Sequence, residues 1–379
     1  MKPIWILAIA LLLSACVSNS QIPGIANPTV VSSETLISTS QTIAPTDSPT
    51  PTQTTVPVET PTTPALAPIS PENLFSLVQL HSIAIPDTRE VLFSKNGNFF
   101  AATSGNQTNF GAIAFDSISG NILHNYQPYD GIVWGLDISK DDLWLATTSS
   151  SSDKQGITIW NLTNNQLLVK LNQPSAPDSV AFSPDGSVLA IGGVETWPNG
   201  VIWMYDAETW TPLQKMDAPG QNVLALKFSP DGNILASAGT DGKIRIWNPR
   251  NGSLVQTLFH ANQANSIAFS PGGELLTSTF CSKSDATGCT EGGVVVWRTS
   301  DWRIMQTFSD LAETVAFSVD GKLLVTGSGA NDPQIRFRRT IDWLTIYSIQ
   351  ESSNAVAFNK DGTRFLTANW NEIKQYVID

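Results

Sequence analysis

Along most of the chain, apolar and polar residues alternate with a period of two or form short apolar runs, a pattern that favours strands over helices. A short motif recurs at the ends of apolar runs: an aromatic or aliphatic residue followed by Ser-Pro-Asp-Gly or a variant of it, as in Phe182-Ser-Pro-Asp-Gly. We call this motif the turn phrase. In the clearest copy, residues 223–228, 234–237, 243–247 and 254–258 predict four strands. The Asp-Gly pairs between them predict tight hairpin turns, because glycine accepts positive φ. Each copy therefore predicts an antiparallel meander of four strands.

The turn phrase occurs seven times. Its copies begin at Phe93, Ile138, Phe182, Phe228, Phe269, Phe317 and Phe358, so successive copies lie 41 to 48 residues apart. A repeat of about 40 to 50 residues is typical of the four-stranded blades of a β-propeller. We therefore predict an all-β fold, a seven-bladed propeller over residues 72–379.

These repeats resemble the WD-repeat family. The resemblance is carried by residues 239–247, with the sequence Gly-Thr-Asp-Gly-Lys-Ile-Arg-Ile-Trp, and by residues 157–160 and 294–297. The family's Gly-His pair is missing from every copy, and only the fourth copy keeps the Asp before its Trp. The buried His-Ser/Thr-Asp-Trp bonding set of the family should thus be mostly absent, leaving apolar packing to hold the blades. His260 occupies a position where the family has its His, but we interpret it as a partly exposed loop residue.

The two ends of the repeat region are predicted to meet. The last copy stops at Asp379, directly after its third strand at residues 372–377. Residues 74–80 resemble the fourth strands at residues 254–258 and 304–308. We expect this N-terminal segment to pair with the C-terminal strand and close the ring, which removes two open sheet edges.

Long loops gather on one predicted face of the ring. In a four-stranded meander, the first and third turns lie on one face, and the second turns and the crossings between blades lie on the other. First turns are short, whereas second turns are long and varied, which favours the second-turn face as the binding surface. The alternative is that insertions accumulate there without function. The aromatic residues expected to contact a partner on this face are Phe110, Tyr129, Trp197 and Trp370.

These aromatic side chains lie near amides such as Asn199 and Asn369, an arrangement that suits flat contact with a protein or a sugar ring. Each aromatic residue alone could instead pack beneath its own loop. Trp210, Trp302 and Trp343 all occur at third turns. Because they recur at one position of the blade, we expect them to pack between neighbouring blades and not to form a partner surface.

Cys281 and Cys289 lie in the longest insertion and are predicted to form a disulfide, since export would place them in an oxidising compartment. Two free thiols, or a metal pair without further Cys or His ligands, are the alternatives. The chain has three histidines, which leaves little material for metal binding or acid/base catalysis. We predict no metal site, no cofactor and no catalytic residues.

The N-terminus predicts a secretory signal: Lys2, then an apolar run over residues 4–13, then a small-residue processing site. Leu13, Ser14, Ala15 and Cys16 resemble the lipobox of bacterial lipoproteins. The resemblance implies cleavage before Cys16 and lipidation of its sulfur. A transmembrane helix is the weaker alternative because the run is too short; an ordinary secreted protein is another.

Three regions are predicted from this organisation: a signal peptide at residues 1–15, a lipidated Cys and disordered Thr/Pro-rich stalk at residues 16–71, and the propeller at residues 72–379. The stalk residues cannot form a core and favour extended conformations. Its hydroxyls offer glycosylation sites, although an unmodified linker explains the composition equally well. The expected location is extracytoplasmic, on a bacterial membrane and attached through the lipid anchor only.

The formal net charge is −12 and no long basic cluster occurs, which argues against a nucleic-acid partner. We expect a monomeric, non-enzymatic binding or scaffold module that recognises a protein or cell-surface polymer. The alternatives are a structural subunit of an envelope assembly, and an extracytoplasmic propeller hydrolase or lyase with a carboxylate site near the central channel. The enzyme is disfavoured because Asp and Glu are scattered through turns, and we expect none to recur on the inner strands.

Overall fold

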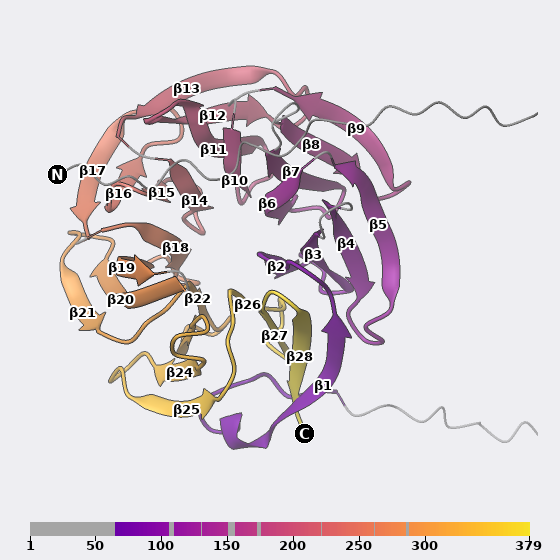
Figure 1. Ribbon diagram of the computed structural model, residues 1–379, viewed down its shortest axis with the longest axis vertical. Coiled ribbons are helices and arrows are strands. Elements are labelled where there is room, and N and C mark those ends of the chain that lie inside the picture. Colours follow the sequence, from indigo (N-terminus) through magenta and orange to yellow (C-terminus); the bar gives the residue numbers. More distant parts are fainter. Residues whose placement is uncertain are drawn as a thin grey trace, which may run out of the picture. The chain divides into compact units, whose positions relative to one another are not determined.

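The computed structural model describes residues 65–379 except 106–109, 130, 151–155, 173–175, 221, 261 and 286–287. In this part of the chain, the strands form seven antiparallel sheets of four strands each, arranged as blades around a ring (Figure 1). The predicted seven-bladed all-β propeller is confirmed. Among the same residues, no helix has both the length and the apolar character needed to cross a membrane.

Each blade runs from an inner strand to an outer strand. Blade 1 contains β2 (Val91–Phe93), β3 (Phe99–Gly105), β4 (Phe110–Asp116) and β5 (Ile122–Tyr129). Blade 2 contains β6 (Ile132–Ile138), β7 (Trp144–Ser150), β8 (Gly156–Asn161) and β9 (Gln166–Leu171). Blade 3 contains β10 (Ala176–Phe182), β11 (Val188–Thr196), β12 (Asn199–Asp206) and β13 (Pro212–Ala218). Blade 4 contains β14 (Val223–Phe228), β15 (Leu235–Gly239), β16 (Lys243–Trp247) and β17 (Leu254–Phe259).

Blade 5 contains β18 (Ala264–Phe269), β19 (Leu275–Asp285), β20 (Gly288–Arg298) and β21 (Ile304–Phe308). Blade 6 contains β22 (Thr314–Phe317), β23 (Leu323–Gly327), β24 (Ile335–Arg339) and β25 (Thr345–Ile349). Blade 7 contains β26 (Ala355–Phe358), β27 (Arg364–Ala368), β28 (Glu372–Ile378) and β1 (Leu77–Ala84). A 3-10 turn, η1 (Leu74–Ser76), precedes β1.

The turn phrase ends every inner strand, and its chemistry explains why it recurs. In blade 3, Ser183 Oγ donates to Asp185 Oδ1 at 2.6 Å and accepts a hydrogen bond from Val188 N at 3.0 Å. Gly186 takes a positive φ of 83°. In blade 7, Asn359 replaces the Ser and accepts from Arg364 N at 2.8 Å. The phrase thus caps the first turn and directs the chain into the second strand.

The hydrophobic core is divided among the seven contacts between neighbouring blades. Each core cluster combines apolar residues of two adjacent blades, so each blade buries its faces against its neighbours. Between blades 7 and 1, for example, Phe100 and Phe115 pack with Leu366 and Ile373, all fully buried. An isolated blade would expose both of its apolar faces, so the blades are stable only as a ring.

Pairing of β1 with β28 closes the ring, with Leu77 opposite Ile378 and Ala84 opposite Glu372. The expected closure is therefore confirmed, but the expected strand at residues 74–80 is shifted. Residues 74–76 form η1, because Leu74 turns inward and is fully buried between blades 6 and 7. The packed region also begins before residue 72, since Ile69 is buried in the same cluster and its N–H donates to Gly362 O at 2.8 Å.

His260 is a half-buried loop residue, as expected, but it also makes a contact that belongs to the family's bonding set. Its Nε2 is hydrogen-bonded to Ser278 Oγ, and its ring lies against Phe280 and Trp297 at centroid distances of 4.9 and 5.0 Å. Burial lowers the pKa of His260 to about 4. One His–Ser pair of the family's bonding set is therefore kept at the contact between blades 4 and 5, next to the Trp of blade 5.

The third-turn tryptophans pack between blades, as expected. Trp210 of blade 3 meets Trp144 of blade 2 edge to face at 6.0 Å. Trp343 of blade 6 meets Phe308 of blade 5 at 6.2 Å. Trp302 packs against the cluster shared by blades 4 and 5. All three are half-buried, which identifies this set as part of the scaffold.

Removal of the closing segment should destabilise the propeller. A chain that begins at residue 65 should unfold cooperatively, whereas a chain that begins at residue 86 lacks β1 and the buried Ile69 and Leu74. The lost burial alone should lower the free energy of unfolding by at least about 4 kcal/mol. The free β28 edge should also promote aggregation. Urea unfolding and light scattering measure both effects, and equal urea midpoints for the two chains would contradict ring closure.

Candidate functional site

Two of the four predicted partner-contacting aromatics, Trp370 and Trp197, have side chains that the structure describes, and they lie in different blades. Trp370 lies in the second turn of blade 7 and is 48% exposed, and Trp197 lies in the second turn of blade 3 and is 71% exposed. No ring contact joins these two side chains among the described residues. The backbones of Phe110 and Tyr129 are paired in blade 1, but their side chains lie outside the described part of the structure.

Backbone hydrogen bonds to the crossing between β1 and β2 hold the turn that carries Trp370. Asp87 N donates to Trp370 O at 2.7 Å, and Ile85 N donates to Asn371 O at 2.9 Å. The crossing therefore runs along the second turn of blade 7 before it enters blade 1. This contact brings Arg89, the next charged residue of the crossing, beside the Trp370 ring.

Arg89 is stacked between two tryptophans. Its guanidinium carbon lies 4.7 Å from the centre of the Trp370 ring and 4.2 Å from that of the Trp134 ring. Asp87 Oδ1 accepts a hydrogen bond from Arg89 Nη2 at 3.0 Å and fixes the guanidinium plane. Blades 7, 1 and 2 thus contribute Trp370, Arg89 and Trp134 to one surface, which we call the Trp-Arg-Trp stack.

Our sequence analysis did not single out Arg89 or Trp134. Trp134 belongs to the inner strand β6, where the register shifts between Val133 and Gly135. Side chains of inner strands normally alternate between the two neighbouring blades, and an irregularity of this kind can redirect one of them. The one signal in the sequence was Trp134 itself, a bulky aromatic residue in an inner strand that is otherwise ordinary.

Arg89 and Trp134 of the Trp-Arg-Trp stack line a cavity of about 500 Å³ in the central channel, together with Asp178, Glu313 and Asn354. These residues lie at or next to the starts of the inner strands of blades 3, 6 and 7, on the second-turn face. The expectation that carboxylates would not recur at the inner strands is therefore wrong. Adjacent blades place such residues around one opening, although they are far apart in the sequence.

Asp178 is held by the neighbouring blade. Its Oδ2 accepts a hydrogen bond from Asn222 Nδ2 at 2.5 Å. Burial raises the pKa of Asp178 to about 6, and the bond to Asn222 opposes this rise only in part. At neutral pH the group is thus a largely ionised acceptor in a partly desolvated site.

Glu313 has a similar arrangement on the opposite side of the opening. The Asn354 amide lies 3.2 Å from Glu313 Oε2 and 3.1 Å from Trp370 Nε1, and one orientation of this amide satisfies both. Burial raises the pKa of Glu313. Asn354 thereby links the carboxylate to the Trp-Arg-Trp stack.

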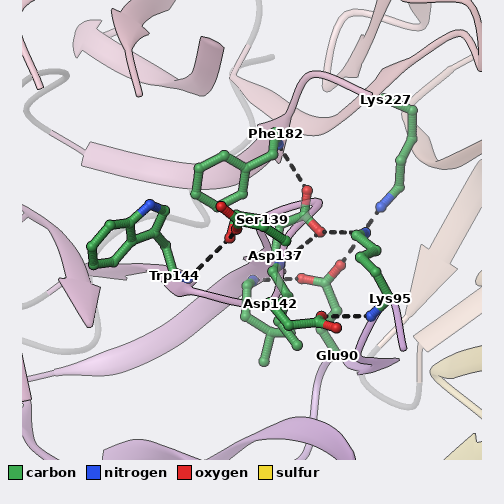
Figure 2. Close-up of polar contacts among 11 residues, drawn as sticks. Glu90, Lys95, Asp137, Ser139, Asp142, Trp144, Phe182 and Lys227 are labelled. Carbon is green, nitrogen blue, oxygen red and sulfur yellow. Dashed lines mark hydrogen bonds and ion pairs between the residues drawn. The ribbon is translucent and has the colours of Figure 1, made fainter. Parts of the chain in front are cut away.

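Deeper in the channel, a charged pair connects opposite sides of the ring. Lys227 Nζ of blade 4 lies 4.0 Å from Glu90 Oε1 at the start of blade 1 (Figure 2). Glu90 Oε2 accepts a hydrogen bond from Leu136 N of blade 2 at 2.9 Å. Burial raises the pKa of Glu90, and Lys227 opposes this rise.

The second-turn opening thus combines a cation between aromatic rings with acceptors on two other sides. Stacked Arg and Trp side chains provide flat, rigid contact area at a low entropy cost, and the carboxylates accept hydrogen bonds from donors of a ligand. Asp178 and Glu313 come from blades 3 and 6, and each is engaged by an Asn of the following blade. No cluster of three potential metal-ligating side chains occurs among the described residues. The arrangement is suited to recognition.

The long insertion of blade 5 is a hairpin extension. Strands β19 and β20 each have 11 residues. Cys281 and Cys289 are joined by a disulfide across this hairpin, with their Cα atoms 5.7 Å apart. Asn331 Nδ2 of blade 6 donates to Cys289 O at 3.0 Å, which ties the extension to the neighbouring blade.

Comparisons with known proteins agree with the fold. Residues 210–248 match the family model described as "WD domain, G-beta repeat". Together, the fold and this match define the chain as a seven-bladed β-propeller that carries a WD repeat. Similar proteins include SEC12-like protein 1 of Arabidopsis thaliana, 27% identical over 59% of this chain and 58% of that protein. Small ribosomal subunit protein RACK1y of Oryza sativa subsp. japonica is 31% identical over 41% of this chain and 44% of that protein.

Pre-mRNA-processing factor 19 homolog 2 of Arabidopsis thaliana is 28% identical over 40% of this chain and 27% of that protein. The chain therefore spans less than two thirds of each of these relatives. Because each match covers only part of both proteins, the binding surface has to be argued from its own residues.

Replacement of Asp178 by Asn should change how stability depends on pH. Because the folded-state pKa of about 6 lies above the ordinary Asp pKa of about 3.9, the folded state binds the proton more tightly. The stability contributed by this carboxyl is thus fully present below about pH 4 and is lost as the pH rises through about 6. The free energy of unfolding of the wild type minus that of Asp178→Asn should therefore decrease by about 2 kcal/mol as the pH rises from about 4 to 7. This value allows for partial exposure of the carboxyl to solvent.

Urea unfolding at both pH values measures this difference. Asp217→Asn is the matched control, because the Asp217 side chain is 80% exposed. Its stability relative to wild type should not change with pH over this range. A constant difference for Asp178→Asn as well would show that Asp178 is not desolvated.

Proposed function

We propose that this protein is a lipid-anchored, extracytoplasmic binding or scaffold module that recognises a partner through its second-turn face. The observation that carries this proposal is the Trp-Arg-Trp stack at the edge of the channel opening. The proposed partner is a protein. A cell-surface polymer is the other outcome that the experiment below distinguishes.

Exposed aromatic side chains support a binding role for this face. Trp197 and Trp370 are 71% and 48% exposed although both are large and apolar. Tryptophan and arginine are the residue types that most often dominate the energy of protein interfaces. The carboxylates beyond the stack add polar acceptors, so a partner would find an apolar contact surface with a polar surround.

The names of relatives are consistent with a role in assemblies. One is a small ribosomal subunit protein, and another is eukaryotic translation initiation factor 3 subunit I, 23% identical over 45% of this chain. Both names describe components of larger complexes. In this chain, a signal-like segment and Cys16 precede a Thr/Pro-rich stretch in the N-terminal region.

The hydrolase or lyase alternative has one supporting observation, the two channel carboxyls with raised pKa values. Perturbed carboxyls in a cavity are typical of catalytic sites. Here, however, Asp178 and Glu313 belong to blades 3 and 6 and bond to different Asn residues. Binding is therefore the better supported function.

Affinity capture from envelope extracts tests the face. The bait is the full chain, compared with Trp370→Ala and with Arg89→Lys, which keeps the charge but loses the planar stack. Both variants should recover at least about tenfold less partner than wild type, since interface hot spots contribute about 2 kcal/mol or more. Ile341→Ala is the matched control, because Ile341 is 86% exposed at the third turn of blade 6, on the opposite face.

Thermal unfolding of each bait checks that the variants are folded. Protease treatment of the extract should abolish capture of a protein, whereas a polymer would still be recovered. Equal recovery by wild type, Trp370→Ala and Arg89→Lys would refute the second-turn face as the binding surface.

The lipid anchor has its own test. Cys16→Ser should abolish incorporation of radiolabelled palmitate and move the protein from the detergent phase to the aqueous phase, because two or three acyl chains supply the membrane affinity. Ser18→Ala should keep both properties. A Cys16→Ser protein that remained in the detergent phase would mean that another segment holds it in the membrane.

A further inference from the structure

The opposite mouth of the channel is lined by lysines. On the first-turn face, an open cavity of about 900 Å³ lies at the ends of the inner strands. Its lining includes Lys95, Lys140, Lys227 and Lys360, from blades 1, 2, 4 and 7. Three aspartates, Asp137, Asp141 and Asp142, line the cavity as well, so the charge that a ligand meets depends on how each group is engaged.

The repeat itself explains how three of these lysines come together. Lys360, Lys95 and Lys140 each follow the Ser or Asn of the turn phrase, in the consecutive blades 7, 1 and 2. The same position is Pro184 in blade 3, and it is proline in blades 4 and 5 and valine in blade 6. Because the phrase places this position at the same point of every first turn, the lysines form a continuous arc, with Pro184 at one end of it.

The carboxylates in this cavity are already engaged with backbone groups. Asp142 Oδ1 and Oδ2 accept from Lys95 N at 2.6 Å and Asn96 N at 2.8 Å. Asp137 Oδ2 accepts from Phe182 N at 2.8 Å (Figure 2). Asp141 Oδ1 accepts from a Ser hydroxyl at 2.6 Å. These three carboxylates connect turns and strands, and the donors at those bonds stabilise their negative charge.

The lysine ammonium groups are engaged to different degrees. Lys95 Nζ lies 3.5 Å from Asp137, and Lys227 Nζ lies 4.0 Å from Glu90 (Figure 2). Lys140 and Lys360 are exposed and form no ion pair with any residue that the structure describes. Two ammonium groups at the rim are therefore available to a ligand, and two more can turn toward it from within.

We propose that the first-turn mouth binds a compact organic anion that carries two or more carboxylate or phosphate groups. Lys140 and Lys360 would contact its charged groups at the rim. Phe182, Phe228 and Pro184, which also line the cavity, would pack against its organic part. The volume lies within the range of about 300 to 1,000 Å³ that is typical of small-molecule sites. This mouth lies at the other end of the channel from the Trp-Arg-Trp stack, and Lys227 and Phe228 line the cavities at both ends. The proposal does not rest on the function of the second-turn face.

Isothermal titration calorimetry on the full chain in a non-ionic detergent at low ionic strength tests the proposal. Citrate is the carboxylate probe and inositol hexakisphosphate is the phosphate probe, so that the tighter binder identifies the charged group. The double variant Lys140→Ala/Lys360→Ala should bind the preferred probe about tenfold more weakly, as expected for the loss of two exposed charge contacts.

Lys170→Ala is the matched control, because Lys170 is an exposed lysine on the outer strand β9, away from the cavity. It should bind like wild type, and so should Trp370→Ala, which separates this site from the second-turn face. The proposal is overturned if neither probe binds, or if the double variant and Lys170→Ala lose affinity equally, which would indicate non-specific attraction to lysines.

Discussion

Burial of apolar residues between neighbouring blades is the interaction on which the whole structure depends. Each blade has an apolar surface on both faces, and neither face can be covered within the blade. Stacking the blades in a line would leave one face of each terminal blade exposed. Closing the ring buries both faces, and the pairing of β1 with β28 completes the blade at which the ring closes.

Ring closure also builds the second-turn opening. The crossing that leaves β1 bonds to the turn carrying Trp370 and then delivers Arg89 to it. The Trp-Arg-Trp stack therefore joins the last repeat, the first repeat and the second, although Arg89 and Trp370 are separated by most of the repeat region. The same chain segment completes the fold and positions the candidate binding surface, so stability and recognition are linked at this contact.

The features predictable from the sequence were those that depend on local chemistry. All seven turn phrases end inner strands, because a Ser or Asn cap and a positive-φ residue, which is Gly in every blade except blade 2, specify the turn through neighbouring residues alone. The features missed depend on contacts between distant repeats. The inward turn of Leu74, the hydrogen bond of His260 to Ser278 and the approach of Arg89 to Trp134 all require a neighbouring blade to be in place. The alternation of apolar and polar residues along a single strand does not predict these contacts between blades.

The candidate binding residues occur at positions that differ between the blades, whereas the positions that recur in every blade form the fold. The position after the Ser of the turn phrase tolerates Lys, Pro or Val, because the turn is held by the residues on either side of it. Substitution there leaves the scaffold unchanged and alters the charge of the first-turn mouth. Second turns vary in length for the same reason, since they lie outside the packed faces. A closed ring of similar blades thus offers two openings whose chemistry can change independently, one through loop length and aromatic residues, the other through a single turn position.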